Sequence, residues 1–205
     1  MKANGKPTPE RILDAAMSLF AERGYEATSV GAIEMAAGMA PRSGALYQHF
    51  KGKKDVLEKA LDRQMAVLDE LGTSLADLDL GDLQAELTLM ARWNLSSLDQ
   101  RRELVMFLRR DGDHLPDELR SKLYKRLVEE PYAEVVDWLR KRFEVGEGPQ
   151  PDLEALALVL IETMVSFRSM QWIFGKTPGD VDDDRFVETW VEVGLAYDRR
   201  QGLEP

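Results

Sequence analysis

Apolar residues recur at intervals of three and four along most of the chain, which is the spacing of one face of an α-helix. The first such pattern begins at Thr8, a suitable N-terminal cap, and ends before Gly24. Its predicted buried residues are Ile12, Leu13, Ala16, Leu19 and Phe20. No stretch alternates between apolar and polar residues for long enough to predict a strand. The sequence therefore predicts an all-α fold.

Residues 28–54 contain two short helical patterns joined by a glycine-containing turn. In the first pattern Thr28 or Ser29 can cap the N-terminus, and Gly38 can end the helix because glycine tolerates the left-handed backbone. The second pattern begins near Ser43. The predicted buried residues of the two patterns are Val30, Ile33, Ala36, Ala37, Leu46 and Phe50. This arrangement is typical of a helix-turn-helix.

The polar side chains of the second pattern favour a nucleic-acid contact. Its exposed face carries Tyr47, Gln48 and His49, and a basic cluster follows at residues 51–54. Hydroxyl, imidazole and ammonium groups suit phosphate oxygens, which provide most of the contacts that position a protein on DNA. Arg42 lies at the N-terminal end, where base edges in the major groove would be met. The alternative is an ordinary helical hairpin with a solvated basic end.

These residues also resemble the N-terminal domain of the tetracycline-repressor (TetR) family of transcriptional regulators. The resemblance covers Arg11 to Leu57 and rests on residues in the family's order and nearly at its spacing: Ala15, Ala16, Phe20, Gly24, Thr28, Ile33, Ala37, Gly38, Tyr47, Phe50 and Lys53. Pattern and resemblance together give the candidate DNA-binding residues Thr28, Arg42, Ser43, Gly44, Ala45, Tyr47, Gln48, His49, Lys53 and Lys54.

The chain departs from the family pattern in two ways that concern the base contacts. The turn between Gly38 and Leu46 is about two residues longer than the commonest family form, so the entry to the recognition helix must differ locally. Ala45 stands where the family often has Thr, and Glu34 stands where it usually has a small Ala.

The remaining chain predicts a second, entirely helical domain. The resemblance implies an N-terminal three-helix helix-turn-helix domain over residues 1–52 and a C-terminal helical ligand-binding and dimerisation domain over residues 53–205. Residues 1–7 form a polar arm, residues 146–151 a loop, and Pro131 is expected to kink or split its helix. Helices are expected over residues 53–75, 83–98, 99–110, 118–145, 153–174 and 182–200.

Charge is distributed unevenly between these parts. Residues 1–56 hold 8 basic and 6 acidic residues, a net charge of +2, whereas the remainder holds 19 and 31, a net charge of −12. A phosphate backbone should therefore repel the C-terminal part but not the N-terminal domain. The apolar segment 153–174 is interrupted by Glu154, Glu162 and Arg168, which predicts a buried helix and no membrane span. The N-terminus lacks the apolar run of a signal peptide, so a cytoplasmic location is expected.

The last two helices carry more apolar surface than one small domain needs. Phe186, Trp190, Gly194 and Tyr197 are candidates for a homodimer interface, and burial inside the monomer is the alternative. Methionine and aromatic residues in the middle helices suit an adaptable effector pocket but also suit an ordinary core. The charged Arg168 must be paired, with Glu162 or another acid, or await an anionic ligand. The candidate effector-binding residues are Met90, Trp93, Met106, Phe107, Tyr124, Trp138, Met164, Phe167 and Arg168.

The favoured hypothesis is a ligand-responsive transcriptional repressor. It binds a palindromic double-stranded DNA operator as a homodimer and is released by a small-molecule effector in the C-terminal domain. One alternative is a small all-helical enzyme without DNA binding. The chain offers only His49 and His114, no cysteine, no HExxH-type metal pair and no glycine-rich phosphate loop, so no cofactor or metal is expected. A helical protein-interaction module would leave Tyr47, His49 and Lys53 without a role.

Overall fold

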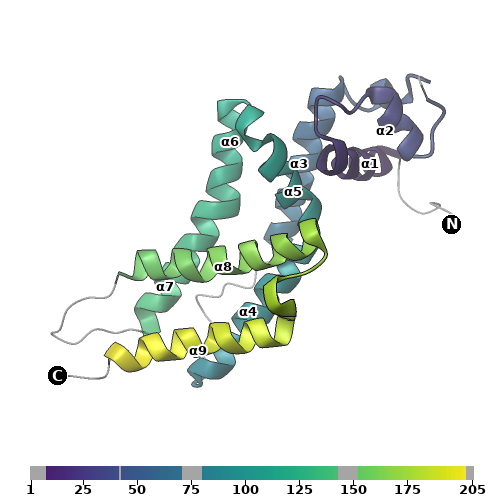
Figure 1. Ribbon diagram of the computed structural model, residues 1–205. Helices are drawn as coiled ribbons and strands as arrows, with labels where there is room; N and C mark the ends of the chain where they lie inside the picture. The colour runs from purple at the N-terminus through teal and green to yellow at the C-terminus, as the bar shows by residue number, and fades with distance from the viewer. Residues whose placement is uncertain (1–7, 42, 71–79, 143–151, 202–205) are drawn as a thin grey trace. The chain divides into compact units, whose positions relative to one another are not determined.

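The computed structural model describes residues 8–41, 43–70, 80–142 and 152–201, and every regular element in these ranges is helical (Figure 1). The chain divides into two compact units, each built from two segments: residues 1–72 with 101–123, and residues 73–100 with 124–205. The first unit thus contains the predicted helix-turn-helix together with two helices from later in the chain. The expected polar arm and the 146–151 loop lie outside the described residues.

The first unit is a helical cluster around the N-terminal helix. Its elements are α1 (Thr8–Arg23), α2 (Val30–Ala36), the 3₁₀ turn η1 (Ala45–Gln48), α3 (Lys53–Glu70), α5 (Arg102–Asp111), the 3₁₀ turn η3 (Gly112–His114) and α6 (Asp117–Tyr124). Helix α1 packs against α2, α3 and α5. Phe20 is fully buried in this core, with its ring centroid 5.3 Å from Tyr25 and 6.2 Å from Phe107. The predicted inward stripe of the first helix is buried as expected.

The second unit packs two long C-terminal helices against α4 and α7. Its elements are α4 (Leu83–Gln100), the π-helical segment η4 (Lys125–Glu129), α7 (Glu130–Arg142), α8 (Leu153–Phe174), the 3₁₀ turn η5 (Pro178–Asp180) and α9 (Asp183–Gln201). The expected interruption near Pro131 occurs as the π segment directly before it. Proline has no N–H to donate and its ring clashes with the preceding turn, and a π segment relieves both problems. Within the described residues, no helix combines the length and apolar character needed to cross a bilayer.

A glycine allows close approach of two helices in the second unit. A Cβ atom at Gly194 of α9 would lie 2.9 Å from Cδ1 of Leu87 in α4, which is too close for two carbon atoms. The preceding turn of α9 carries Trp190, whose indole N–H donates to the carbonyl of Leu160 in α8 at 3.1 Å. Helix α9 is therefore fastened to both α4 and α8 through its inner face.

An ion-pair cluster around Arg168 joins the same three helices. The Arg168 guanidinium, buried in α8, makes two hydrogen bonds with the Asp183 carboxylate, at 3.0 and 2.9 Å, and lies 3.3 Å from the Asp99 carboxylate. Gln171 completes the cluster by accepting from Arg168 at 2.6 Å and donating to Asp183 at 3.1 Å. The expected pairing of Arg168 is thus present, but with Asp183 and Asp99, whereas Glu162 is exposed.

These contacts lower the pKa of the Asp183 carboxyl. Burial by itself raises the pKa of this carboxyl, but the hydrogen bonds from Arg168 and Gln171 and the charges of Arg168 and Arg92 outweigh burial. The net result is a pKa below the ordinary value of 3.8. Because the folded-state pKa is depressed, the stabilisation is present above the ordinary pKa and is lost as the pH falls through the lower folded value.

We expect Asp183→Asn to lower the free energy of unfolding at pH 7 by about 1–2 kcal/mol, the value of a charge-assisted hydrogen bond reduced for partial exposure. In this variant the buried charge of Arg168 faces a neutral amide at position 183 and keeps only the Asp99 carboxylate as an ion-pair partner within the cluster. Urea unfolding across a pH series measures the effect, with Glu188→Gln, an exposed site on α9, as control. The difference between wild type and Asp183→Asn should shrink below about pH 4. A difference that stays constant down to pH 3 would contradict this assignment.

Candidate nucleic-acid interface

Helix α2 is defined by caps at both ends. Ser29 is its N-cap, and the hydroxyl accepts a hydrogen bond from the Ala32 N–H at 3.2 Å. At the other end Gly38 adopts a φ of 77°, and its N–H donates to the carbonyl of Met35 at 3.0 Å. The Met39 N–H donates to the carbonyl of Glu34 at 2.8 Å, which completes a Schellman motif. The predicted end of this helix at Gly38 is therefore confirmed.

The second pattern forms a much shorter element than the expected recognition helix. Only the four residues of η1 are helical, and they follow Gly44, whose φ is 72°. Leu46 and Phe50 are buried, as predicted, with 0% and 8% of their surface exposed. Tyr47 is 61% exposed, and Gln48 and His49 are exposed beside it. The element thus holds its apolar side chains inward and offers three polar side chains to a partner.

A buried carboxylate connects α2 to η1. Glu34 has no exposed surface, and its Oε1 accepts a hydrogen bond from the Leu46 N–H at 3.2 Å. The hydroxyl of Ser43 lies 3.5 Å from the same oxygen and also accepts from the Ala45 N–H at 3.3 Å. In the sequence, Glu34 stands out only as a departure from the family pattern. Its position directly after Ile33, on the buried side of α2, is the one local sign of this contact.

Thr28 and Lys53, two further candidate DNA-binding residues, make contacts within the protein. Thr28 is 1% exposed, and its hydroxyl donates to the carbonyl of Gly24 at 2.7 Å. The Lys53 ammonium donates to the carbonyl of Tyr25 at 2.9 Å and lies 4.2 Å from the centre of the Tyr25 ring. Burial, aided by the charges of Glu26 and Glu58, raises the pKa of Tyr25, so this ring stays neutral beside the ammonium. Arg42 lies outside the described residues.

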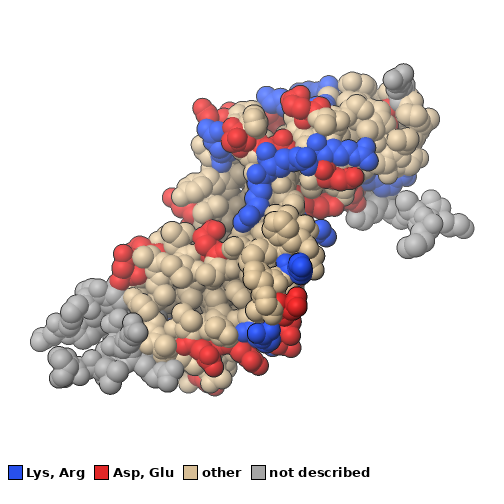
Figure 2. Space-filling view, viewed as in Figure 1, with Lys and Arg blue, Asp and Glu red and all other residues tan. Residues whose placement is uncertain are grey.

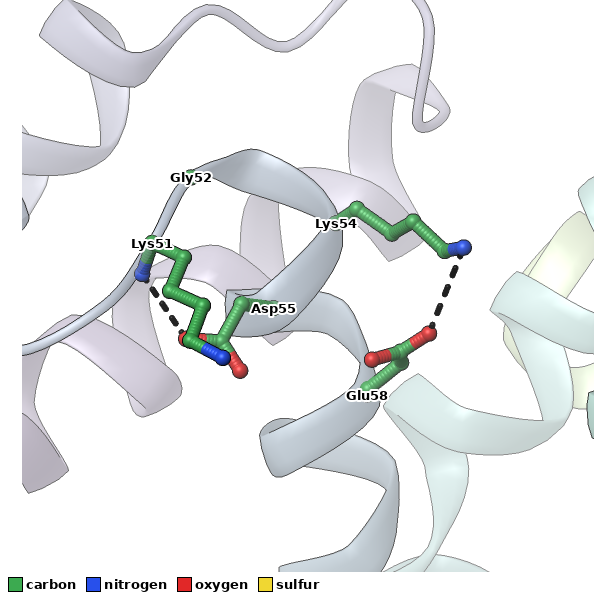
Figure 3. Close-up of a pocket in the computed structure, with 5 residues that line it drawn as sticks. All are labelled: Lys51, Gly52, Lys54, Asp55 and Glu58. Atoms are coloured by element: carbon green, nitrogen blue, oxygen red, sulfur yellow. Dashed lines mark hydrogen bonds and ion pairs between the residues drawn. The ribbon is translucent and has the colours of Figure 1, made fainter.

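A surface hollow of about 280 Å³ lies at the N-terminal end of α3, lined by Lys51, Gly52, Lys54, Asp55 and Glu58 (Figure 3). The Asp55 carboxylate accepts from the Lys51 backbone N–H at 2.8 Å, and the Lys54 ammonium lies 3.7 Å from Glu58. Both acids therefore already have partners, whereas the Lys51 and Lys54 side chains are exposed. The backbone N–H groups in the first turn of a helix add positive electrostatic potential at the helix N-terminus, where this hollow lies.

Helix α5 fastens the turn between α1 and α2. Asp111 accepts from the Tyr25 N–H at 3.3 Å, and Arg110 donates to the carbonyl of Glu22 at 2.6 Å. A Cβ atom at Gly24, whose φ is 89°, would lie 3.3 Å from the Asp111 carboxylate. On the other side of α1, Arg11 donates through Nε to the Ala37 carbonyl at 3.1 Å. These anchors cannot be predicted from local sequence patterns, because their partners lie 26 to 88 positions away in the chain.

The candidate effector residues fall in both units. Met106 and Phe107 belong to the first unit, where Phe107 contacts Phe20. The exposed Tyr124 and the partly exposed Trp93 belong to the second unit. The others are buried in the core of the second unit, where Phe167 stacks on Phe186 with 4.0 Å between centroids. These buried residues are Met90, Trp138, Met164, Phe167 and Arg168.

The candidate dimer residues mostly face the interior of the second unit. Phe186 stacks on Phe167, Trp190 bonds to α8, and Gly194 contacts Leu87, so these three residues serve packing within one chain. Tyr197 is partly exposed. The apolar side chains that α8 and α9 do expose are Leu158, Val159, Ile173, Phe174 and Val193. Figure 2 shows a broad area over these helices with few charged side chains.

Comparisons with known proteins agree with this geometry. Residues 12–60 match the model of the bacterial regulatory proteins of the tetR family. The HTH-type transcriptional regulator AcrR of Shigella flexneri is 26% identical over 184 residues, covering 88% of this chain and 85% of that protein. The HTH-type transcriptional repressor KstR2 of Rhodococcus jostii is 34% identical over 106 residues, covering 51% of this chain and 50% of that protein.

A solved structure shows the same fold over nearly the whole chain. The structure of AibR in complex with isovaleryl coenzyme A and operator DNA has a TM-score of 0.67 at 20% identity, covering 91% of this chain and 97% of that one. The expectation of an all-α fold with an N-terminal helix-turn-helix is confirmed. The related proteins are named as regulators of transcription, which confirms a regulator in preference to an enzyme. Residues 12–60 therefore form the N-terminal domain that the tetR family of bacterial regulatory proteins shares, and the chain is similar to transcriptional regulators over most of its length.

Proposed function

We propose that this regulator is a repressor that binds an inverted-repeat operator as a homodimer and releases it when a small molecule binds the second unit. The observation that carries the DNA-binding part is the exposure of Tyr47, Gln48 and His49 on an element whose opposite side is buried. Phosphate contacts position a protein on a duplex, and base-edge contacts in a groove give sequence preference. The KstR2 relative, which is named a repressor, supports that direction of control.

The hollow at the start of α3 is the proposed phosphate site. Lys51 and Lys54 supply two exposed positive charges, of which the Lys54 ammonium lies 3.7 Å from the Glu58 carboxylate, and the first-turn N–H groups of α3 can add donors. Lys53 has a different role, because its ammonium holds the Tyr25 carbonyl and so ties α3 to the α1–α2 turn. We assign Lys51 and Lys54 to the DNA backbone and Lys53 to the support of the motif.

The proposed dimer forms through the outer faces of α8 and α9. Leu158 and Val159 of α8 are 52% and 55% exposed, and Val193 of α9 is 52% exposed. Exposed apolar side chains in an area with few charges are typical of an interface between copies. A two-fold pair of recognition elements then requires an operator with two-fold symmetry.

The proposed effector site lies in the second unit, and acyl-coenzyme A thioesters are the first class to test. The support is the AibR structure, which holds isovaleryl coenzyme A on the same fold. Helix α4 of the second unit precedes α5 directly in the chain, and α5 holds the α1–α2 turn through Arg110 and Asp111. A displacement of α4 would therefore reach the helix-turn-helix through the covalent chain.

The decisive experiment selects duplexes from a random DNA library with the full-length protein. We expect enrichment of an inverted repeat, a protein mass of two chains in the bound complex, and affinity that falls steeply with salt. Random DNA of the same length is the control. Failure to enrich any sequence at low salt would remove the proposed function, and enrichment of a site without two-fold symmetry would remove the dimeric arrangement.

The phosphate site predicts the effect of Lys54→Ala on the salt dependence. Loss of one phosphate contact should lower the slope of log affinity against log salt by about 0.9 per subunit and weaken operator and random DNA to the same extent. Lys59→Ala is the matched control, since Lys59 is exposed on the same helix. Equal slopes for Lys54→Ala and wild type would show that the hollow does not bind the duplex.

The effector proposal predicts that acyl-coenzyme A thioesters weaken operator binding by about 5- to 150-fold, the usual range of coupling between two sites. Coenzyme A without an acyl group is the control. Linkage requires the operator to lower the affinity for the thioester by the same factor, which fluorescence titration with and without operator measures. If thioesters of short, medium and long chains all leave operator affinity unchanged, this effector class is wrong.

A further inference from the structure

We propose that Glu34 is a positioning residue that sets the orientation of η1 and thereby determines the base preference of the protein. This inference rests on the proposed DNA-binding function and adds to it a residue that does not touch DNA. Glu34 is fully buried on α2, so its carboxylate acts only through the groups that contact it inside the protein.

Glu34 holds both ends of the long turn between α2 and η1. Its backbone carbonyl accepts from the Met39 N–H at 2.8 Å, where the turn begins. Its side-chain Oε1 accepts from the Leu46 N–H at 3.2 Å, where the turn ends. A longer turn loses more entropy when its ends are fixed, and two hydrogen bonds to one residue provide the closure that the turn needs.

The carboxylate also replaces the missing N-terminal cap of η1. Every helical turn begins with N–H groups that have no acceptor inside the turn, and a side chain at the N-cap position usually supplies one. The N-cap position of η1 is Gly44, which has no side chain. Glu34 supplies the acceptor from another helix instead, and its negative charge suits the positive end of the turn. Ser43 adds a second acceptor for the Ala45 N–H.

The burial of this acid has a cost that its contacts with η1 offset. A buried carboxylate loses its hydration, and among the described residues Oε2 accepts no hydrogen bond. Alanine at this position would avoid that cost and favour the helix slightly more. The contacts that the side chain makes in return go to Ser43 and Leu46. The hydrogen bonds of the Glu34 side chain therefore stabilise the position of η1 and of the exposed Tyr47, Gln48 and His49.

The experiment compares Glu34→Ala, Glu34→Gln and Ser43→Ala with wild type on the DNA site selected by the wild-type protein and on random DNA. Glu34→Ala should lower the ratio of the two affinities at least about tenfold, while random DNA binding stays within about twofold. Glu34→Gln keeps an acceptor oxygen and should restore the ratio to within about threefold of wild type. Glu118→Gln, an exposed acid in the first unit, controls for the change in net charge.

Hydrogen exchange of the Leu46 amide provides a readout that does not need DNA. We expect its exchange in the free protein to be at least about tenfold faster in Glu34→Ala and near the wild-type rate in Glu34→Gln. Ser43 is exposed, so Ser43→Ala should fold normally and lower the affinity ratio by a smaller factor than Glu34→Ala.

The outcomes separate this inference from the proposed function. A wild-type protein that selects no site would remove the DNA-binding function and this inference with it. A wild-type protein that selects a site, together with Glu34→Ala that keeps the wild-type affinity ratio, would overturn the role of Glu34 alone. If Glu34→Ala does not fold, the other two variants decide. The role of Glu34 would be overturned if Ser43→Ala keeps the wild-type affinity ratio while Glu34→Gln loses it. The acceptor oxygen that Glu34→Gln retains would then not be the acting group.

Discussion

A helical turn of four residues cannot hold its own shape in water, because too few hydrogen bonds form to offset the entropy of ordering the backbone. The turn η1, which we propose as the recognition element, is of this kind. It depends on burial of Leu46 and Phe50 and on the hydrogen bond from its Leu46 N–H to Glu34. The polar side chains proposed to meet the bases stand on or directly beside this turn, so their placement depends on the helices that bury Leu46 and Phe50.

Those helices are held in turn by α5, which begins 66 positions after the end of α2 in the chain. Arg110 and Asp111 bind the backbone of the α1–α2 connection, and Phe107 packs on Phe20. Unit one is thus not a free-standing N-terminal module, since part of its core comes from residues that follow α4. This connectivity explains why the compact units do not follow a single cut in the sequence.

In the second unit, the apolar face of α9 has two possible partners, and only the fold selects between them. The pattern of α9 correctly predicts an apolar stripe, but periodicity cannot say whether α4 or a second copy covers that stripe. The structure shows that Gly194 and Trp190 meet α4 and α8 of the same chain. Likewise the charge of Arg168 requires a partner, and only the packing of α4 and α9 against α8 selects Asp99 and Asp183 in place of Glu162.

The sequence by itself determined what depends on neighbouring residues. Helical periodicity, the cap at Ser29, the left-handed glycine at Gly38 and the inward pair of Leu46 and Phe50 are local properties, because backbone geometry and side-chain type act over a few residues. The tertiary structure decided what depends on distant residues. Residue spacing could not predict three features: the hydrogen bond from the Leu46 N–H to the Glu34 carboxylate, the hydrogen bond from Lys53 to the Tyr25 carbonyl, and the partners of the inner face of α9. Hydrogen bonds and packing select their partners by position in space.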